Sequence, residues 1–294
     1  MTKKLIALVS ILIGTTLVPV QAAPTQTIAV VDVGANTSLF SNIVTEVCIV
    51  ESLTCPNGKK FMEGAGAATI GVSTIAAVNH GTNMISVINK VNPGVGIIPI
   101  KIAALNAQGT LGIYTNDAVK QALDWVVANR VKYNIAAVSV SQGKIFSGCY
   151  VPAGTVEDVK ALKANNVPVI AAAGNDSNKD SMMSIACLPD VISVGATDNP
   201  DPGITKQAYC KTCTPTIAKY SNGNPTLYLN GRWYVTQTDG STKFLVGTST
   251  ATASFAAWWV LNFKGNFADT YASILGSTTA TSSAERTGKY VALP

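Results

Sequence analysis

Thr27-Ile28-Ala29-Val30-Val31 is a continuous run of apolar and β-branched residues that stops at Asp32-Val33-Gly34. Such a run, ended by a turn signal, predicts a buried strand followed by a turn. Runs of the same design follow at 97–102, 135–140, 167–172 and 191–194. Strands that are apolar on both faces are typical of a parallel sheet that is covered on each side.

Segments with a helical period alternate with these strands. Residues 117–130 carry a stripe of Val and Leu behind Asn116, which we expect to be the N-cap. Thr155 and the acids after it precede a second helical segment at 159–165. The alternation predicts an α/β fold of three layers, a mostly parallel sheet with helices on both faces, with ligands bound at the carboxyl ends of the strands.

The pattern changes after residue 198. Short alternating pieces at 226–229 and 232–235 predict hairpins and loops, and a helical pattern returns at 251–263. The polar tail at 277–294 is expected to be peripheral. We find no internal repeat and no linker-like segment, so we expect one domain.

The composition excludes several classes of protein. Of the 294 residues, 47% are hydrophobic and 13% are charged, so the chain can bury a large core and is not disordered. The net charge is +5, and the cationic residues are spread along the chain without a run. A nucleic-acid partner or an anionic membrane surface therefore has little support. The oligomeric state is left open.

The one long apolar run lies at the N-terminus, over residues 5–20. Two lysines precede it and small residues follow it, which predicts a signal peptide over residues 1–22 with cleavage after Ala22. We expect residues 23–294 to form the mature chain, outside the cytoplasm, secreted or periplasmic, with no stable membrane association.

Six cysteines suit an oxidising compartment and allow three disulfides in 15 connectivities. Pairing neighbours gives Cys48–Cys55 and Cys210–Cys213, and leaves Cys149–Cys187 as the long-range link. Two alternatives for Cys210 and Cys213, half a zinc site and a redox motif, are weaker. The chain has one histidine, no second pair at that spacing, and no helix start at this loop.

Four segments present polar groups at strand or helix ends. Asp32 ends the first strand, where a carboxylate belongs to a site or caps a turn. His80 is the only histidine, and is either a proton-transfer group, a helix cap or a packed ring. Ser249 lies among small residues before a helix, where it either carries chemistry or caps the helix. Asn175 ends a buried strand with Gly174, which is also an ordinary turn signal.

These four segments, in this order and spacing, resemble the motifs of the subtilisin family of serine peptidases over essentially the whole mature chain. Val30-Val31-Asp32-Val33-Gly34 resembles the aspartate motif and Asn79-His80-Gly81-Thr82 the histidine motif. Ala171-Ala172-Ala173-Gly174-Asn175 resembles the oxyanion motif, and Gly247-Thr248-Ser249-Thr250-Ala251-Thr252 the nucleophile motif.

The resemblance implies a subtilisin-like fold and a secreted serine endopeptidase. Asp32, His80 and Ser249 would be the catalytic residues, and Asn175 would donate to the oxyanion. Polypeptides are the implied substrates. No cofactor is implied. Calcium is suggested only by its occurrence in the family, because no acidic cluster in this sequence is typical of a calcium loop.

The resemblance also implies where substrate binds, through an added strand beside the first specificity pocket. Gln142 stands where the family commonly has an apolar residue, and a Cys149–Cys187 disulfide would clasp the loops that flank the pocket. The implied substrate-binding residues are Ser139, Ser141, Gln142, Gly143, Ala172, Ala173 and Gly174.

The sequence also departs from the family pattern. Val33 replaces a Thr or Ser, Asn83 replaces a second histidine, and Ala253-Ser254 replaces Pro-His. The ten positions from Ala22 to Asp32 leave no room for a recognisable prodomain. The missing prodomain, Val33 and Ala253 favour one alternative, a catalytically impaired subtilisin-like peptide-binding module. A further alternative is an unrelated extracytoplasmic α/β binding protein. A nucleotide site at 64–69 is disfavoured because the final glycine of the motif is missing.

Overall fold

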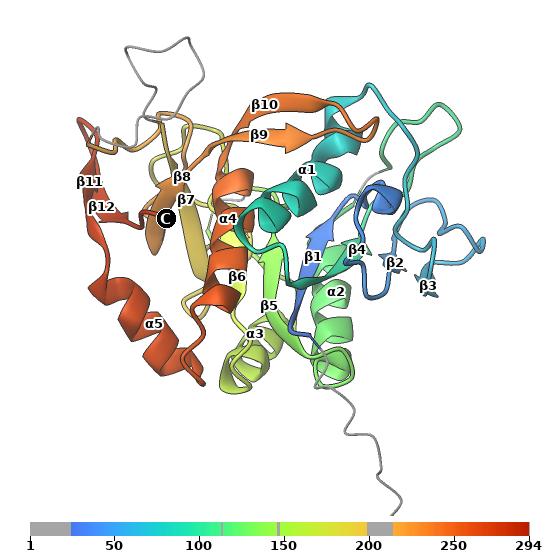
Figure 1. Ribbon diagram of the computed structural model, residues 1–294, viewed down its shortest axis with the longest axis horizontal. Coiled ribbons are helices and arrows are strands. Elements are labelled where there is room, and N and C mark those ends of the chain that lie inside the picture. The colour runs from blue at the N-terminus through green and yellow to red at the C-terminus, as the bar shows by residue number, and fades with distance from the viewer. Residues whose placement is uncertain (1–24, 113, 146–147, 199–213, 294) are drawn as a thin grey trace, which may run out of the picture.

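The computed structural model describes residues 25–112, 114–145, 148–198 and 214–293 (Figure 1). The predicted signal peptide at 1–22 lies outside these ranges, as do Cys210 and Cys213. The elements in chain order are β1 (Thr27–Asp32), the 3-10 helix η1 (Thr37–Leu39), β2 (Val47–Ile49), β3 (Phe61–Glu63), α1 (Ala76–Val91), β4 (Gly96–Lys101), α2 (Asn116–Asn129), β5 (Ile135–Val140), α3 (Thr155–Ala164), β6 (Val169–Ala172), β7 (Ile192–Thr197), β8 (Leu227–Asn230), β9 (Arg232–Thr236), β10 (Thr242–Val246), α4 (Thr248–Leu261), α5 (Phe267–Gly276), β11 (Thr279–Ser282) and β12 (Thr287–Tyr290).

In the described ranges, ten strands form one sheet in the order β11-β12-β8-β7-β6-β5-β1-β4-β2-β3. The strands from β12 to β2 in that order are parallel to their neighbours, and β11 and β3 add antiparallel edges. All five predicted apolar runs are strands of this parallel part. Their carboxyl ends therefore meet at one edge of the sheet, where the predicted site residue Asp32 ends β1 and Gly174 follows β6.

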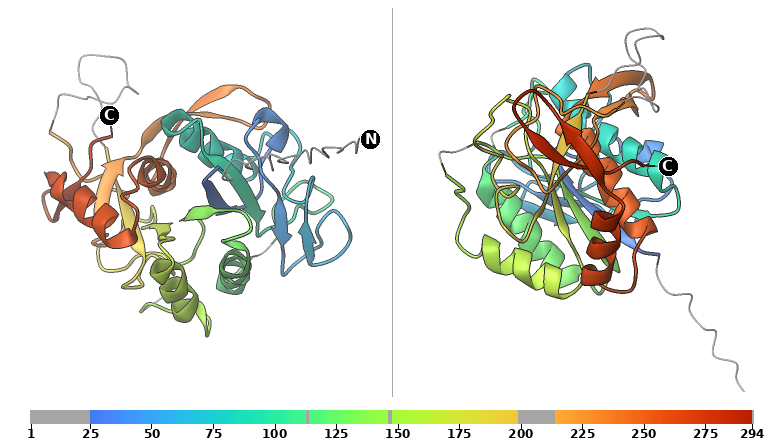
Figure 2. Two further views of the ribbon diagram at one scale, coloured as in Figure 1. Left: turned by 60° about the horizontal axis from the view of Figure 1, so that its bottom comes forward. Right: turned by 90° about the vertical axis from the view of Figure 1, so that its left-hand side faces the viewer.

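Helices cover both faces of the sheet. Ile28 and Val30 of β1 pack into the cluster that contains the buried residues of α1 and α4, whereas Ala29 and Val31 pack into the cluster with α2 and α3. Alternate residues of a strand point to opposite faces, so β1 contributes side chains to a hydrophobic cluster on each side of the sheet. Figure 2 shows α1 and α4 on one side and α2 and α3 on the other. The predicted three-layer α/β fold is confirmed.

The predicted helix caps are wrong by one residue. Thr115 is the N-cap of α2, and its side-chain oxygen accepts a hydrogen bond from Asp117 N. Asn116 lies inside the helix, where its Oδ1 accepts from Ser184 Oγ at 2.7 Å. The N-cap of α3 is Gly154 at φ +83°, a left-handed conformation that glycine adopts without strain. Both errors arise because more than one residue suited to N-capping lies at the start of each helix. The sequence alone does not show which of them becomes the N-cap.

The interpretation of the C-terminal third as hairpins with a peripheral tail is only partly correct. β9 and β10 form the expected hairpin, but β8 pairs with β7 in the main sheet. The tail contributes β11 and β12 to the sheet edge, and Val291 is buried. Polar strands at a sheet edge lack the apolar run that identifies buried strands, so the pattern did not reveal them.

Two of the predicted disulfides are present. Cys48 is bonded to Cys55, and Cys149 is bonded to Cys187. The second joins the segment after β5 to the segment between β6 and β7, which also pair through Lys144 and Ser184. The loops at the carboxyl ends of these two strands are therefore held together.

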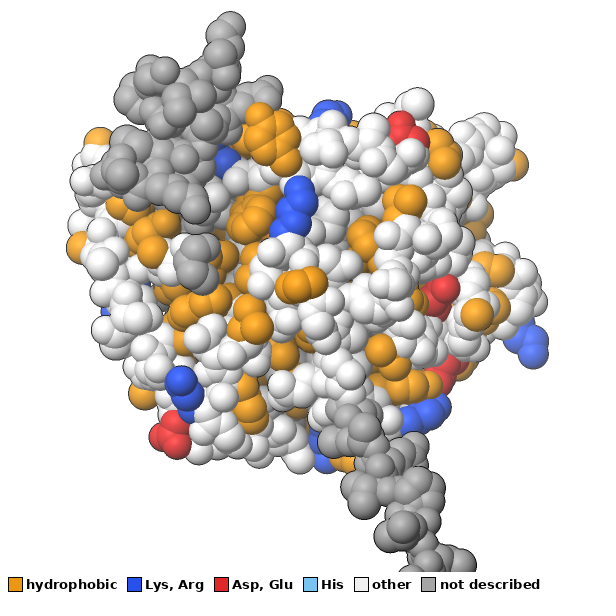
Figure 3. All heavy atoms as spheres, in the orientation of Figure 1, with side chains coloured by type: hydrophobic (Ala, Val, Ile, Leu, Met, Phe, Trp, Pro, Cys, Tyr) orange, Lys and Arg blue, Asp and Glu red, His pale blue; other side chains and the backbone are white. Residues whose placement is uncertain are grey.

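Charged side chains are sparse on the face shown in Figure 3, where hydrophobic and uncharged polar side chains are mixed. This agrees with the low fraction of charged residues in the sequence, 13%. Within the described residues, we find no helix with the length and apolarity needed to cross a membrane.

Candidate active site

Asp32 and His80 form a hydrogen-bonded pair at the carboxyl end of β1. Nδ1 of His80 lies 2.8 Å from Oδ2 and 3.0 Å from Oδ1 of Asp32. The Asp32 side chain is 2% exposed and that of His80 is 23% exposed. Asp32 Oδ1 also accepts from the backbone N–H of Val33 at 2.8 Å. The carboxylate thus engages one nitrogen of the ring and leaves Nε2 on the opposite side.

The residues around His80 explain how α1 approaches β1. A Cβ on Gly81 would lie 2.1 Å from the Gly34 carbonyl oxygen, so only a glycine permits this approach. Thr82 Oγ1 accepts from Asn36 N at 2.9 Å, and Asn79 Oδ1 accepts from Thr238 N at 2.7 Å. The three neighbours of His80 in the motif therefore fix the helix on two sides, which aims the ring at Asp32.

Electrostatics favour a protonated imidazole. Burial lowers the pKa of His80, but the charge of Asp32 and the hydrogen bond to it together outweigh burial, so the pKa is raised above its ordinary value of 6.5. Asp32 therefore stabilises the imidazolium, which is the form that a general base reaches when it takes up a proton.

Ser249 lies in the first turn of α4, whose residues are almost all buried. The residue is 7% exposed, and α4 lies beside α1, which carries His80. The first N–H groups of a helix lack intrahelical acceptors. Among the hydrogen bonds of the described residues, none joins the Ser249 hydroxyl to His80 and none uses the Ser249 N–H. In unliganded enzymes such catalytic hydrogen bonds are often long.

Asn175 is fixed to the start of the same helix. Its Oδ1 accepts from Thr248 N at 2.9 Å and from Thr248 Oγ1 at 3.0 Å, while Thr248 Oγ1 accepts from Gly174 N at 3.2 Å. Buried Asn222 holds the loop from the other side, because its Oδ1 accepts from Asp176 N and Asn178 N. With Oδ1 occupied by Thr248, the Nδ2 donor of Asn175 is left for another acceptor.

Three of the implied substrate-binding residues belong to β5 or to the segment that follows it. Ser141 is nearly buried, with its Oγ 3.5 Å from the Ser249 carbonyl oxygen. Gly143 packs against Ser184, where a Cβ would lie 3.1 Å from the backbone oxygen. Ser139 is 1% exposed inside β5, and its Oγ has no hydrogen-bond partner.

Ala172, Ala173 and Gly174 are also buried, at the end of β6 and beside α4. Substrate contact at all of these positions stays a prediction.

Gln142 lies over the Asp32–His80 pair. Its Nε2 donates to Asp32 Oδ1 at 3.1 Å, and its Oε1 accepts from the Tyr114 hydroxyl. Tyr114, Thr248 and Asn222 were not foreseen from the sequence. Thr248 adjoins the serine motif and carries a hydroxyl at a helix start, which is a usable signal. Tyr114 and Asn222 reach the site only through the tertiary fold, and nothing local marks them.

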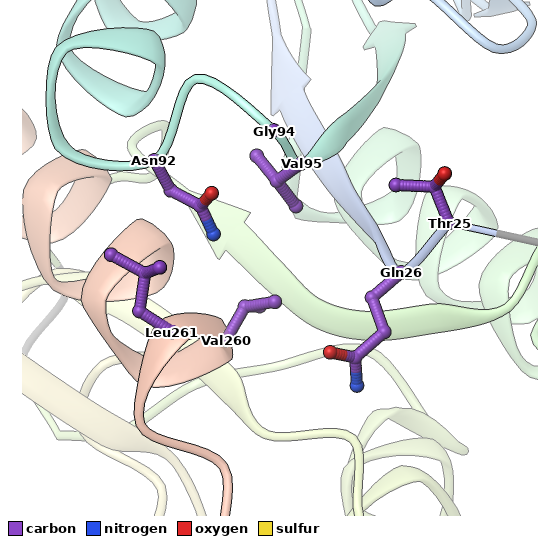
Figure 4. Close-up of a pocket in the computed structure, with 7 residues that line it drawn as sticks. All are labelled: Thr25, Gln26, Asn92, Gly94, Val95, Val260 and Leu261. Carbon is purple, nitrogen blue, oxygen red and sulfur yellow. The ribbon is translucent and has the colours of Figure 1, made fainter.

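The cavity in Figure 4 lies at the other end of the sheet. It measures about 290 Å³ and is lined by Thr25 and Gln26 ahead of β1, by the connection from α1 to β4, and by Val260 and Leu261 at the end of α4. Ser249 and Asp32 are at the opposite ends of α4 and β1, so this cavity is separate from the candidate site.

Within the described ranges, no three His, Cys, Asp or Glu side chains are arranged so that they could hold a metal ion. We therefore assign no calcium ligands.

Comparisons with known proteins point to one family. The model of the subtilase family matches residues 25–282. The extracellular serine proteinase of Thermus sp. (strain Rt41A) is 30% identical over 196 residues, which are 65% of this chain and 42% of that protein. Subtilisin-like protease 3 of Pseudogymnoascus destructans is 30% identical over 155 residues, 48% of this chain and 36% of that protein. The chain thus spans less than half the length of these curated relatives.

Among solved structures, a cold-adapted subtilisin-like serine proteinase is similar, with a TM-score of 0.63 and 18% identity, over 91% of this chain and 88% of that one. At that identity the likeness concerns the fold alone.

Proposed function

The chain belongs to the subtilase family, and on that premise we propose that it is a secreted serine endopeptidase with the triad Asp32, His80 and Ser249. The observation that carries the proposal is the 2.8 Å hydrogen bond between His80 Nδ1 and Asp32. It joins two of the three motif residues at the end of the sheet where α4 begins, with Ser249 in its first turn.

The first chemical step is attack of the Ser249 hydroxyl on a peptide carbonyl carbon. Asp32 accepts from Nδ1–H of His80, so the neutral ring keeps its lone pair on Nε2. Nε2 takes the hydroxyl proton as the C–O bond forms, and the carboxylate stabilises the imidazolium. The tetrahedral intermediate carries its negative charge on the former carbonyl oxygen.

That oxygen would be stabilised by Asn175 Nδ2 and the N–H of Ser249. The Thr248 contacts support this role, because they occupy Asn175 Oδ1 and orient the amide. The helix N-terminus adds a favourable dipole. Collapse of the intermediate breaks the C–N bond, His80 returns the proton to the leaving amine, and water then hydrolyses the acyl-enzyme by the same two steps.

We propose polypeptides as substrates, held along the segment after β5 and the segment after β6. Residues 141–143 and 172–174 belong to these segments and adjoin Ser249 and Asn175. An extended peptide would pair with such segments as an added strand.

We further propose that residues 1–22 are a signal peptide and that residues 23–294 form the peptidase domain outside the cytoplasm. Two disulfides support an oxidising compartment. The extracellular relative from Thermus supports secretion.

A catalytically impaired peptide-binding module is the second candidate. It is favoured by the lack of a hydrogen bond between His80 and the Ser249 hydroxyl among the described residues. A module of this kind would keep the peptide-binding segments without turnover.

A fluorophosphonate probe separates the two candidates, because it reacts only with an activated serine. We expect labelling of the mature chain at Ser249, with loss of labelling in Ser249→Ala and strong reduction in His80→Ala. Folded protein that takes up no label, under conditions where a control subtilisin is labelled, would favour the binding module.

A further inference from the structure

Gln142 reaches the Asp32–His80 pair from the segment that follows β5. Its Nε2 lies 3.1 Å from Asp32 Oδ1 and 3.1 Å from His80 Nδ1. The three side chains thus form a compact triangle in which the carboxylate accepts from both nitrogens. Because Nδ1 is the atom bonded to Asp32, its contact with Gln142 Nε2 is between two donors.

The orientation of the amide is fixed from both ends. A carboxylate only accepts hydrogen bonds, so the amide atom that faces Asp32 is the nitrogen. The other end, Oε1, accepts from the Tyr114 hydroxyl. Burial, with the Asp32 charge, raises the pKa of Tyr114 to about 12, so this hydroxyl is protonated at neutral pH.

The residue that follows Asp32 has no side-chain donor that could replace the Gln142 amide. Val33 follows Asp32 and offers only its backbone N–H, which already donates to Oδ1. Gln142 therefore provides the one side-chain donor to Asp32, besides His80, among the described residues.

The charged groups on the neighbouring elements are engaged elsewhere. Lys101 is paired in register with Asp32 across β1 and β4, but its electrostatic partner is Glu46. On β9, Arg232 is paired with Asp198, and Asp239 in the β9–β10 turn accepts from Ser241 N. Lys90, in the last turn of α1, donates to the Tyr234 carbonyl. The sequence of α4 contains no charged residue. Asp32 is thus the charged group that raises the pKa of His80, and Gln142 Nε2 lies 3.1 Å from the same ring nitrogen.

We propose that Gln142, oriented by Tyr114, is a positioning residue whose amide N–H holds the Asp32 carboxylate against the His80 ring and takes up part of its charge. Its catalytic consequence rests on the proposed function. A carboxylate that shares its charge with a third donor stabilises the imidazolium less. Gln142 therefore keeps more of the base neutral in mildly acidic solution, while it restricts rotation of the carboxylate.

The single histidine allows a test that needs no activity. The imidazole of the untagged mature chain is titrated by NMR in a Ser249→Ala background, which prevents self-digestion. Gln142→Met keeps the length of the side chain and removes the donor. Tyr114→Phe removes the hydroxyl that orients it. Gln121→Met, on the exposed face of α2, is the matched control.

We expect Gln142→Met to raise the pKa of His80 by roughly 0.5–1 unit, since a hydrogen bond to a charged group is removed. Tyr114→Phe should raise it by less, and its effect should vanish when Gln142 is already Met. In the control the pKa should equal that of the parent. An unchanged or lowered pKa in Gln142→Met, in a protein whose near-UV circular dichroism matches the parent, would overturn the proposal.

A kinetic arm then tests the catalytic consequence in chains that retain Ser249. On the acid side of the pH profile, Gln142→Met should lower kcat/KM by about 3–10-fold. This is the factor by which a rise of roughly 0.5–1 unit in the pKa of His80 reduces the fraction of neutral imidazole. KM should change less than kcat. If the parent hydrolyses no peptide while the NMR shift is present, the proposed function fails and the positioning role stands. If the parent is active and the NMR shift is absent, the positioning role fails alone.

Discussion

Nδ1 of His80 lies 2.8 Å from Oδ2 of Asp32, although 48 positions separate the two residues in the chain. The contact exists because β1 ends at the edge of the sheet where α1 crosses it, with Gly81 against the Gly34 carbonyl. It commits one ring nitrogen to the carboxylate and leaves the other for chemistry.

The pH dependence of catalysis should follow His80. Its pKa is raised because the charge and hydrogen bond of Asp32 outweigh burial, and the neutral ring is the active form. kcat/KM should therefore increase with pH, with a midpoint above 6.5, the ordinary value of histidine. In Asp32→Asn, burial acts without the compensating charge, so the midpoint should fall below that value.

The measurement is the pH profile of kcat/KM on active-site-titrated enzyme. Asp124→Asn, at an exposed position of α2, is the matched control and should keep the parent midpoint. An Asp32→Asn midpoint equal to that of the parent would mean that the carboxylate does not govern the ring.

Removal of the Asn175 amide should slow the chemical step. We expect kcat of Asn175→Ala to fall about 10²–10³-fold with little change in KM, which is the range known for loss of the corresponding donor in subtilisin itself. Asn57→Ala, in the exposed loop between β2 and β3, should leave kcat unchanged. Steady-state kinetics on a peptide substrate decide the matter, and equal losses in kcat from both variants would exclude a specific role for Asn175.

Gly81→Ala should disturb the site although alanine is the better helix former. The added Cβ would lie 2.1 Å from the Gly34 oxygen, so α1 must shift away from β1. We expect a destabilisation of about 1–3 kcal/mol and a large loss of activity. Gly276→Ala in α5, where the Cβ would meet open space, should be neutral or stabilising. Urea unfolding of both variants tests this, and equal stabilities would show that the close approach is not required.

The two described disulfides should differ in their contribution to stability. Cys149 and Cys187 are 38 positions apart and Cys48 and Cys55 are 7 apart. On the loop-entropy model the longer loop contributes about 4 kcal/mol and the shorter about 2 kcal/mol. Denaturant unfolding of the two double Cys→Ser variants should show the larger loss for Cys149 and Cys187. The reverse order would mean that closure of the loop is not the dominant effect.

The sequence was most informative where burial on two faces leaves an apolar run. β1 and the other parallel strands follow from such runs, and the three layers follow from their alternation with helices. The edge strands β11 and β12 were not foreseen, because a strand with one solvated face and few apolar residues resembles a loop. β8 was assigned to a hairpin since Leu227 and Trp233 lie in adjacent short runs, and the choice of partner depends on the sheet.

The candidate site, like the fold, could be predicted from the sequence only in part. Asp32, His80, Asn175 and Ser249 were singled out by their place at strand and helix ends together with a family resemblance, and their joint catalytic role stays a prediction. The role of Gln142 could not be predicted, because its partner Tyr114 lies 28 positions away in a different segment. A motif indicates which residues share a task, whereas contacts such as Gln142 with Asp32 depend on how separate segments meet in the fold.

The central claim is that Asp32, His80 and Ser249 act as one unit in peptide-bond hydrolysis. The most direct test is hydrolysis of a peptide library by the mature chain and by the variants Ser249→Ala, His80→Ala and the triple alanine variant. Groups that act as a unit give non-additive losses, so we predict that either single variant falls to the activity of the triple variant. Hydrolysis that persists in Ser249→Ala, or single losses that multiply to that of the triple variant, would contradict the claim.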